Sequence, residues 1–172
     1  MAIRKRTIQP SIWQDPDFGT LSPLAQLIFI GCITQADDEG RLNGHPAVIK
    51  SSLFPYETMT LEQIFDGLQE IINKVMNFIY YSVDGQFYIQ LKNWGKHQIL
   101  REDRLIKSTF PQPPKDIVAG RCRASDRQVG AEVSKEVSKE VRPPQAAAVI
   151  KILDGLRSDL EAKGILKNTK LL

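Results

Sequence analysis

The segment from Leu21 to Ala36, "LSPLAQLIFIGCITQA", most limits how this chain can fold. Ser22 is typical of a helix N-cap and Pro23 of the first helical position, so we expect a helix to begin there. Apolar residues then fall on nearly every side of that helix. A helix that is apolar all round must be buried, so it should lie at the centre of the domain. Its apolar run is shorter than the roughly 18 residues that a membrane span needs.

The segments after this helix alternate turn signals with periodic apolar runs. "DDEG" predicts a turn in which Gly40 takes positive φ, "RL" a short strand, and "HPAVIKSSLF" a helix from near Pro46 that ends before Pro55. In "TLEQIFDGLQEIINKVM", Thr60 is the expected N-cap of an amphipathic helix. "FIYYSV", "DG" and "QFYIQL" predict a β-hairpin with a two-residue type I′ turn.

The resulting order is helix, short strand, helix, helix, strand, turn, strand. It predicts an α+β domain, and it is the order of a winged helix-turn-helix, with three helices and a β-hairpin wing. We expect this domain to span residues 1–110. A basic, largely disordered linker should follow over 111–144, where the repeated "SKEV" indicates disorder or a transient helix. Residues 145–172 should form an amphipathic helix and tail, the helix either docked on its own domain or binding a partner.

Composition excludes several classes of protein. The N-terminus has basic residues but no apolar region behind them, so we expect no secretory signal, and the cytoplasm of a bacterial host cell is the expected location. Cys32 and Cys122 fit no ligand spacing and should be reduced. The acidic triplet of the turn lacks further spaced oxygen ligands, so we expect no metal. Neither His45 nor His97 sits in a catalytic motif, and no phosphate-binding glycine loop is present. We therefore expect no enzyme and no cofactor.

The amino-acid sequence of four stretches resembles that of a known family. "IRKRTIQPSIWQD", "LSPLAQLIFIGCITQADDEGRL", "IKSSLFPYE" and "DGQFYIQLKNWGKHQ" are similar to the N-terminal winged-helix domain of bacteriophage and prophage replication proteins. These are of the replisome-organiser or replication-initiation type, related to bacterial primosome proteins of the DnaD kind. The resemblance covers about residues 3–98. It implies a role in starting phage DNA replication, with DNA, double- or single-stranded, and a replicative helicase or its loader as partners. The chain after Pro111 is too short and polar for the second domain of the larger members.

The helix over residues 60–76 occupies the place of a DNA-reading helix, but its outward face is acidic. Glu62, Asp66 and Glu70 would repel phosphate, against the single cation Lys74. Gln63, Gln69 and Asn73 could nevertheless pair with bases. Groove reading, a merely solvated face, and contact with a partner protein or a second copy of the domain all remain open. For a partner, we expect contacts through Glu62, Asp66 and Glu70, and through Ile152, Leu156 and Leu160 of the C-terminal helix.

The cations that could hold a DNA backbone lie elsewhere. Residues 1–100 hold 8 Lys and Arg against 10 Asp and Glu, whereas residues 101–172 hold 15 against 10. Trp94 could stack on an unpaired base, although the core is the commoner place for each aromatic side chain; Trp13 and Phe18 are expected to pack against the first helix. Outside the acidic helix, the predicted DNA contacts are Arg4, Lys5, Arg6, Lys92, Trp94, Lys96, His97, Arg101, Arg104 and Lys107.

Overall fold

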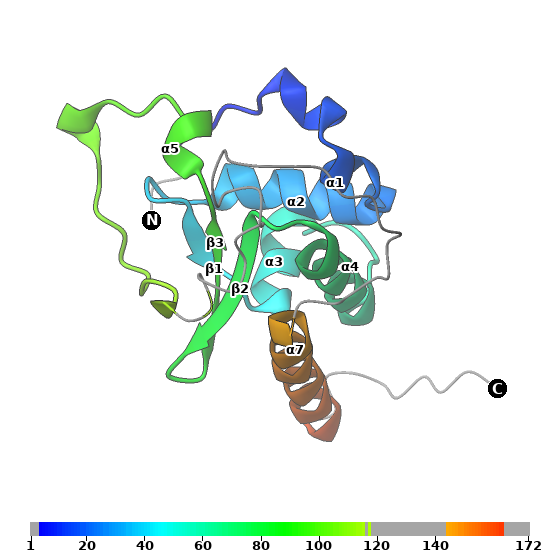
Figure 1. Ribbon diagram of the computed structural model, residues 1–172. Coiled ribbons are helices and arrows are strands. Elements are labelled where there is room, and N and C mark those ends of the chain that lie inside the picture. The colour runs from blue at the N-terminus through cyan, green and yellow to red at the C-terminus, as the bar shows by residue number, and fades with distance from the viewer. Residues whose placement is uncertain (1–3, 116, 118–143, 164–172) are drawn as a thin grey trace, which may run out of the picture.

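The computed structural model describes residues 4–115, 117 and 144–163 of the chain, and its architecture is mixed α+β (Figure 1). The order of helices and strands predicted from the sequence is found. In chain order the elements are η1 (Pro10–Gln14), α1 (Pro16–Gly19), α2 (Pro23–Gln35), β1 (Arg41–Asn43), α3 (Pro46–Leu53), α4 (Leu61–Lys74), β2 (Phe78–Val83), β3 (Gln86–Leu91), α5 (Trp94–His97), η2 (Glu102–Arg104) and α7 (Pro144–Ala162).

The three strands form one antiparallel sheet in the order β1-β3-β2. Ile89 of the central strand pairs with Leu42 on one side and with Tyr80 on the other. The turn between β2 and β3 has φ of 51° at Asp84 and 74° at Gly85. Two positive φ values are what a type I′ turn requires, so the predicted hairpin is confirmed.

Helix α2 lies against α3 and α4, and its inner side is fully buried at Ala25, Ile28 and Cys32. Gly67 of α4 lets the two helices approach, because a Cβ there would lie 2.6 Å from Ile28. The expectation that α2 is covered all round was wrong on one side, where Leu27 is 54% exposed. A domain of this size has too few elements to surround one helix completely.

The sheet is covered on both faces. Tyr80 and Tyr81 point to opposite sides, and both are fully buried. The Tyr80 hydroxyl donates to the Gly44 carbonyl at 3.0 Å, on the helical side. The Tyr81 hydroxyl donates to the Pro111 carbonyl at 2.6 Å, so the chain beyond β3 returns to cover the other face. Pro111, the first residue of the expected linker, therefore packs with the domain.

The N-terminal residues 4–9 form no strand. The chain from residue 4 to residue 9 has no ladder partner in the sheet. Instead the side-chain amide of Gln98 replaces one rung. Its Oε1 accepts from the Thr7 N–H at 3.0 Å and its Nε2 donates to the Thr7 carbonyl at 2.8 Å. A buried glutamine thus holds the N-terminal arm without a strand.

Helix α7 docks on α4 of the same chain. In Figure 1 it lies below α4. Leu153 and Leu160 are 2% and 7% exposed, and Leu156 is half-buried. Of the two arrangements that the sequence left open, the structure has the docked one. The side chain of Ile152, the "SKEV" repeat and Cys122 lie outside the described residues.

Among the helices that the structure describes, none combines the length and the hydropathy needed to cross a membrane. Cys32 is a buried free thiol, and burial raises its pKa to about 12.

The turn at Gly40 gives a direct test of this packing. Gly40 has φ of 79°, and a Cβ there would lie 2.8 Å from Cγ of Trp94. We expect Gly40→Ala to lower the free energy of unfolding by about 2 kcal/mol, because alanine is strained at this φ and meets the indole ring. Chemical denaturation measures this. Gly95→Ala is the control, since nothing lies within 4 Å of its Cβ position. An equal loss of unfolding free energy in the two variants would contradict the close packing of Gly40 against Trp94.

Candidate nucleic-acid interface

The C-terminal helix contacts two carboxylates on the outer face of α4, which stay 46% (Glu62) and 64% (Asp66) exposed. The Arg157 guanidinium of α7 lies 3.0 Å from Oδ1 of Asp66 and 3.6 Å from Oε1 of Glu62. The same guanidinium stands over the Phe65 ring, 5.7 Å from its centroid. With Leu153 and Leu160 packed beside it, α7 covers the first half of α4 with one cation placed between two carboxylates. The face predicted to meet DNA or a partner thus meets the chain's own helix.

Glu70, the third predicted acidic contact, holds the start of α2. Its carboxylate accepts from the Ser22 N–H at 2.9 Å, from the Ser22 hydroxyl at 2.6 Å and from Lys74 Nζ at 2.7 Å. Burial alone would raise the pKa of Glu70, but these donors outweigh it and hold the pKa below its usual range. Lys74 also donates to the Thr20 carbonyl at 2.8 Å. Both side chains are therefore engaged within the fold.

The three amides that could read bases lie in different environments. Gln63 forms a capping box with Thr60, its Oε1 accepting from the Thr60 N–H at 2.9 Å. Gln69 is half-buried, and Asn73 is exposed. Gln63 is exposed as Asn73 is, but its Oε1 is engaged at the start of the helix, so Asn73 is the exposed amide of the three with neither a capping role nor partial burial.

The N-terminal cations are held by the acidic turn after α2. Asp38 accepts from Arg4 at 2.8 Å and from Arg6 at 2.9 Å, and also from the Ile106 N–H at 2.9 Å. Burial alone would raise the pKa of Asp38, but the Ile106 N–H and the two guanidinium groups hold it below its usual range. The Arg6 side chain is only 4% exposed. Arg6 therefore serves the fold instead of the predicted DNA contact, Arg4 is half-exposed, and Lys5 is exposed.

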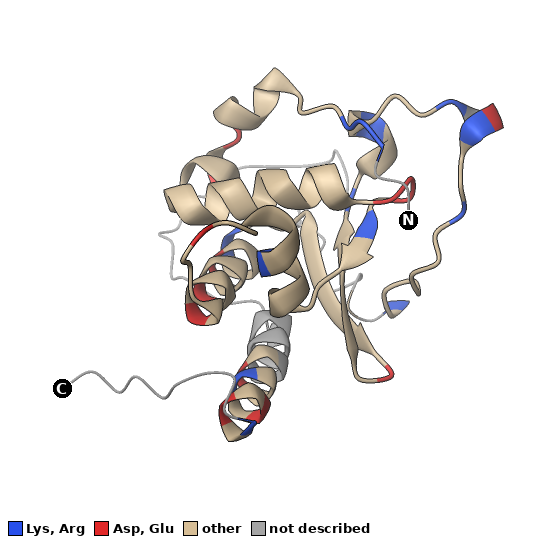
Figure 2. Ribbon diagram, turned by 180° about the vertical axis from the view of Figure 1, so that it is seen from behind, with Lys and Arg blue, Asp and Glu red and all other residues tan. Residues whose placement is uncertain are grey.

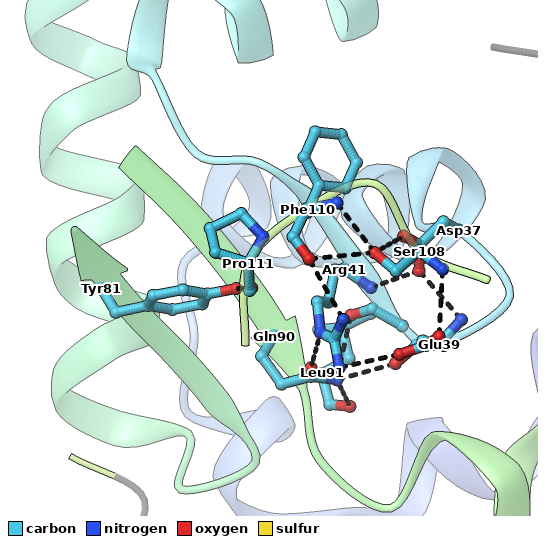
Figure 3. A network of polar contacts seen from close by, with 10 residues as sticks. Asp37, Glu39, Arg41, Tyr81, Gln90, Leu91, Ser108, Phe110 and Pro111 are labelled. Carbon is cyan, nitrogen blue, oxygen red and sulfur yellow. Dashed lines mark hydrogen bonds and ion pairs between the residues drawn. The ribbon is translucent and has the colours of Figure 1, made fainter. Parts of the chain in front are cut away.

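The other two carboxylates of the turn hold the returning chain (Figure 3). Asp37 accepts from the Ser108 hydroxyl and, at 2.9 Å, from the Arg41 N–H. Glu39 accepts from the Ser108 N–H at 3.0 Å and pairs with Arg41 at 2.8 Å. The Arg41 side chain also donates to the Phe110 carbonyl at 3.2 Å. The turn thus ties both the arm and the segment after α5 to the sheet.

The segment after β3 carries the exposed cations. We call Lys96, His97, Arg101, Arg104 and Lys107 the cationic segment; all five side chains are exposed. Lys92 just before it is half-buried. In Figure 2 the blue residues of this segment and of the arm lie on one side of the molecule, whereas the red carboxylates of α4 lie on the other. The positive surface and the predicted reading helix are therefore separate.

Of the two readings of Trp94, the structure has the core one, whereas Trp13 is more exposed than expected. Trp94 is 8% exposed, against Gly40 on one side and with Arg6 5.6 Å from its ring centroid, so it does not offer a free stacking face. Trp13, expected to pack, is 65% exposed and touches Phe18 edge-on with ring centroids 5.5 Å apart. Its position on the short helix η1, before α2 begins, is the signal that could have indicated exposure.

No cluster of three or more potential metal ligands occurs among residues 4–115, 117 and 144–163. His45 caps α3, since its Nδ1 accepts from the Ala47 N–H at 3.2 Å, and burial lowers its pKa. The neutral ring needed for this contact is thus the favoured form.

Comparisons with protein-family models, with curated proteins and with solved structures found no match to this chain.

Asp38 provides a test of the acidic turn. Asp38→Asn should lower the free energy of unfolding by about 3 kcal/mol, because it leaves Arg6 buried without its counter-charge. Since the folded pKa of Asp38 is lowered, its contribution is complete above the ordinary value of 3.8 and is lost as pH falls through the folded pKa. Between pH 7 and pH 2, the free energy of unfolding measured by denaturation should therefore fall less in the variant than in the wild type. Asp103→Asn, at an exposed side chain, is the control and should change little; equal effects would contradict the role of Asp38.

Docking of α7 can be tested through Leu153. A buried aspartate is costly, so Leu153→Asp should release α7 while α2 and α4 keep their packing. Amide hydrogen exchange should then speed up within α7 and stay slow at Ile28 and Leu68. Ser158→Asp places the same charge at an exposed position of α7 and should leave exchange unchanged. Slow exchange in α7 of Leu153→Asp would show that this contact does not hold the helix.

Proposed function

We propose that this chain is a winged-helix DNA-binding protein that acts in the initiation of phage or prophage DNA replication. The observation that carries the fold is topological. Helix α2, strand β1, helices α3 and α4, and the β2-β3 hairpin follow one another in the order of that fold, with β3 between β1 and β2. The hairpin is then the wing and α4 the helix in the reading position.

The distribution of charge supports DNA contact through the cationic segment. Lys96, Arg101 and Lys107 are exposed, and Arg104 is 68% exposed, with its neighbour Asp103 at 3.7 Å. Affinity for a nucleic-acid backbone comes from cations that can replace counterions on phosphates. The cations on and beside α4 are already paired, Lys74 with Glu70 and Arg157 of α7 with Asp66 and Glu62. The proposed DNA path therefore follows the residues after the wing and the exposed Lys5.

The role in replication initiation rests on the resemblance of about residues 3–98 to the phage replication proteins. A helicase or its loader would be the partner that the resemblance implies. This part of the proposal is separable from DNA binding, because the same fold also serves transcription regulators.

A second candidate function is a protein-interaction platform, and the α4–α7 contact favours it. The outer face of α4 already accepts an amphipathic helix with apolar residues at 153 and 160 and a cation at 157. A partner helix with this pattern could replace α7. Under this alternative the acidic face of α4 is the site, and DNA binding is absent.

Charge reversal separates the two candidates. Lys96→Glu with Arg101→Glu should weaken binding of a labelled duplex by about tenfold or more and reduce the slope of log affinity against log salt, because two phosphate contacts are lost. Fluorescence anisotropy at several salt concentrations measures both quantities. Lys163→Glu with Lys50→Glu applies the same charge change elsewhere and should leave most of the affinity. Wild-type protein that binds no DNA at low salt would refute the proposal in favour of the platform.

A further inference from the structure

The N-terminal arm and the cationic segment contact each other at two places. Near the start of the cationic segment, the Thr7 backbone exchanges two hydrogen bonds with the side chain of Gln98. Near its end, Arg4 Nη1 donates to the Arg104 carbonyl at 2.8 Å. The arm therefore lies along the stretch of chain that carries the exposed cations.

Arg4 and Asp38 form one network around the backbone of that stretch. Arg4 Nη1 also donates to Oδ2 of Asp38 at 2.8 Å, and the same oxygen accepts from the Ile106 N–H at 2.9 Å. The Arg104 carbonyl is thus held by Arg4, and the Ile106 N–H by Asp38. Lys107 follows directly, so two exposed cations lie at or next to the held backbone groups.

The backbone over residues 99–107 has few other attachments. Within the part of the chain that the structure describes, its one further hydrogen bond there runs from the Arg104 N–H to the Arg101 carbonyl at 3.0 Å. That bond lies inside the stretch itself. Leu105 and Ile106 are 49% and 56% exposed, so packing contributes little around them. A stretch with so few buried contacts opens readily once an attachment is removed.

The Arg4 side chain is directed toward the domain. It is 37% exposed, and the Asp38 carboxylate that it meets is 3% exposed. To bind a phosphate through Nη1, Arg4 would have to leave both Asp38 and the Arg104 carbonyl. Lys5, the next residue, is exposed and forms no ion pair with any described residue. Lys5 is therefore the better phosphate contact of the two.

We propose that Arg4 is a positioning residue for DNA binding, which holds the cationic segment in the shape in which its side chains meet phosphates. The inference rests on the proposed DNA binding, and it gives Arg4 a role other than the phosphate contact predicted from the sequence. Cations that are already ordered lose less conformational entropy on binding than mobile ones. Arg4 thus raises the affinity for DNA without touching it.

The first test needs no DNA. In Arg4→Ala, amide hydrogen exchange at Arg104 and Ile106, measured by NMR, should become faster, while exchange within α2 and α4 stays slow and shows that the domain is folded. Lys5→Ala removes the same charge one residue away and should leave exchange at both amides unchanged. Equally slow exchange in the two variants would overturn the proposal.

The second test separates positioning from direct contact with phosphate. Arg4→Ala should bind a labelled duplex about tenfold more weakly than the wild type, with the same slope of log affinity against log salt, because no phosphate contact is lost. Lys5→Ala should reduce that slope by about 0.9, the value for one phosphate. Fluorescence anisotropy measures both quantities. An equal reduction of slope in the two variants would show that Arg4 itself contacts DNA.

A double-mutant cycle shows whether Arg4 acts through the segment. In a chain that already carries Arg104→Ala and Lys107→Ala, adding Arg4→Ala should lower the affinity by less than about threefold. A further tenfold loss would refute action through these side chains. If the wild type binds DNA but Arg4→Ala binds equally well, the positioning role alone fails. If the wild type binds no DNA at low salt, the proposed function fails and this role fails with it.

Discussion

Three adjacent carboxylates in the turn after α2 determine where the surface cations lie. Asp38 binds Arg4, Arg6 and the Ile106 N–H, while Asp37 and Glu39 bind Ser108. Two segments that lack strand pairing are fixed to the sheet by these contacts. Unpaired, such side chains and backbone N–H groups would be costly to bury. The acidic turn therefore fixes the N-terminal arm and the end of the cationic segment near Ile106 and Ser108.

The acidic side chains of α4 pair with other groups of the same chain. Glu70 caps α2 together with Ser22, and Glu62 and Asp66 receive Arg157. Each of these three carboxylates, which would repel phosphate, therefore has a hydrogen-bond or ion-pair partner within the fold. Arg157 offsets part of the acidic charge of α4 but leaves Glu62 and Asp66 46% and 64% exposed. Phosphate contact through the cationic segment needs no change in the α4–α7 contact.

Local signals in the sequence were sufficient for most of the fold. Ser22 and Thr60 cap α2 and α4 as expected, and Asp84 and Gly85 form the predicted turn, because caps and turns depend on neighbouring residues alone. Contacts between distant segments were not predictable in this way. Nothing near Arg6 in the sequence indicates that its buried side chain pairs with Asp38. The same applies to Arg157, whose partners lie about 90 residues earlier in the chain. The fold divides the predicted DNA residues into a group engaged within the domain and a group that is exposed.

The central claim, that DNA meets the cationic segment and not α4, is tested most directly by a hydrogen-exchange footprint of the full chain with and without single-stranded DNA. We predict slower exchange over residues 92–107, with α4 and α7 unchanged. Slower exchange on α4 together with faster exchange in α7 would contradict the account, because it would show that DNA displaces α7 and binds the outer face of α4.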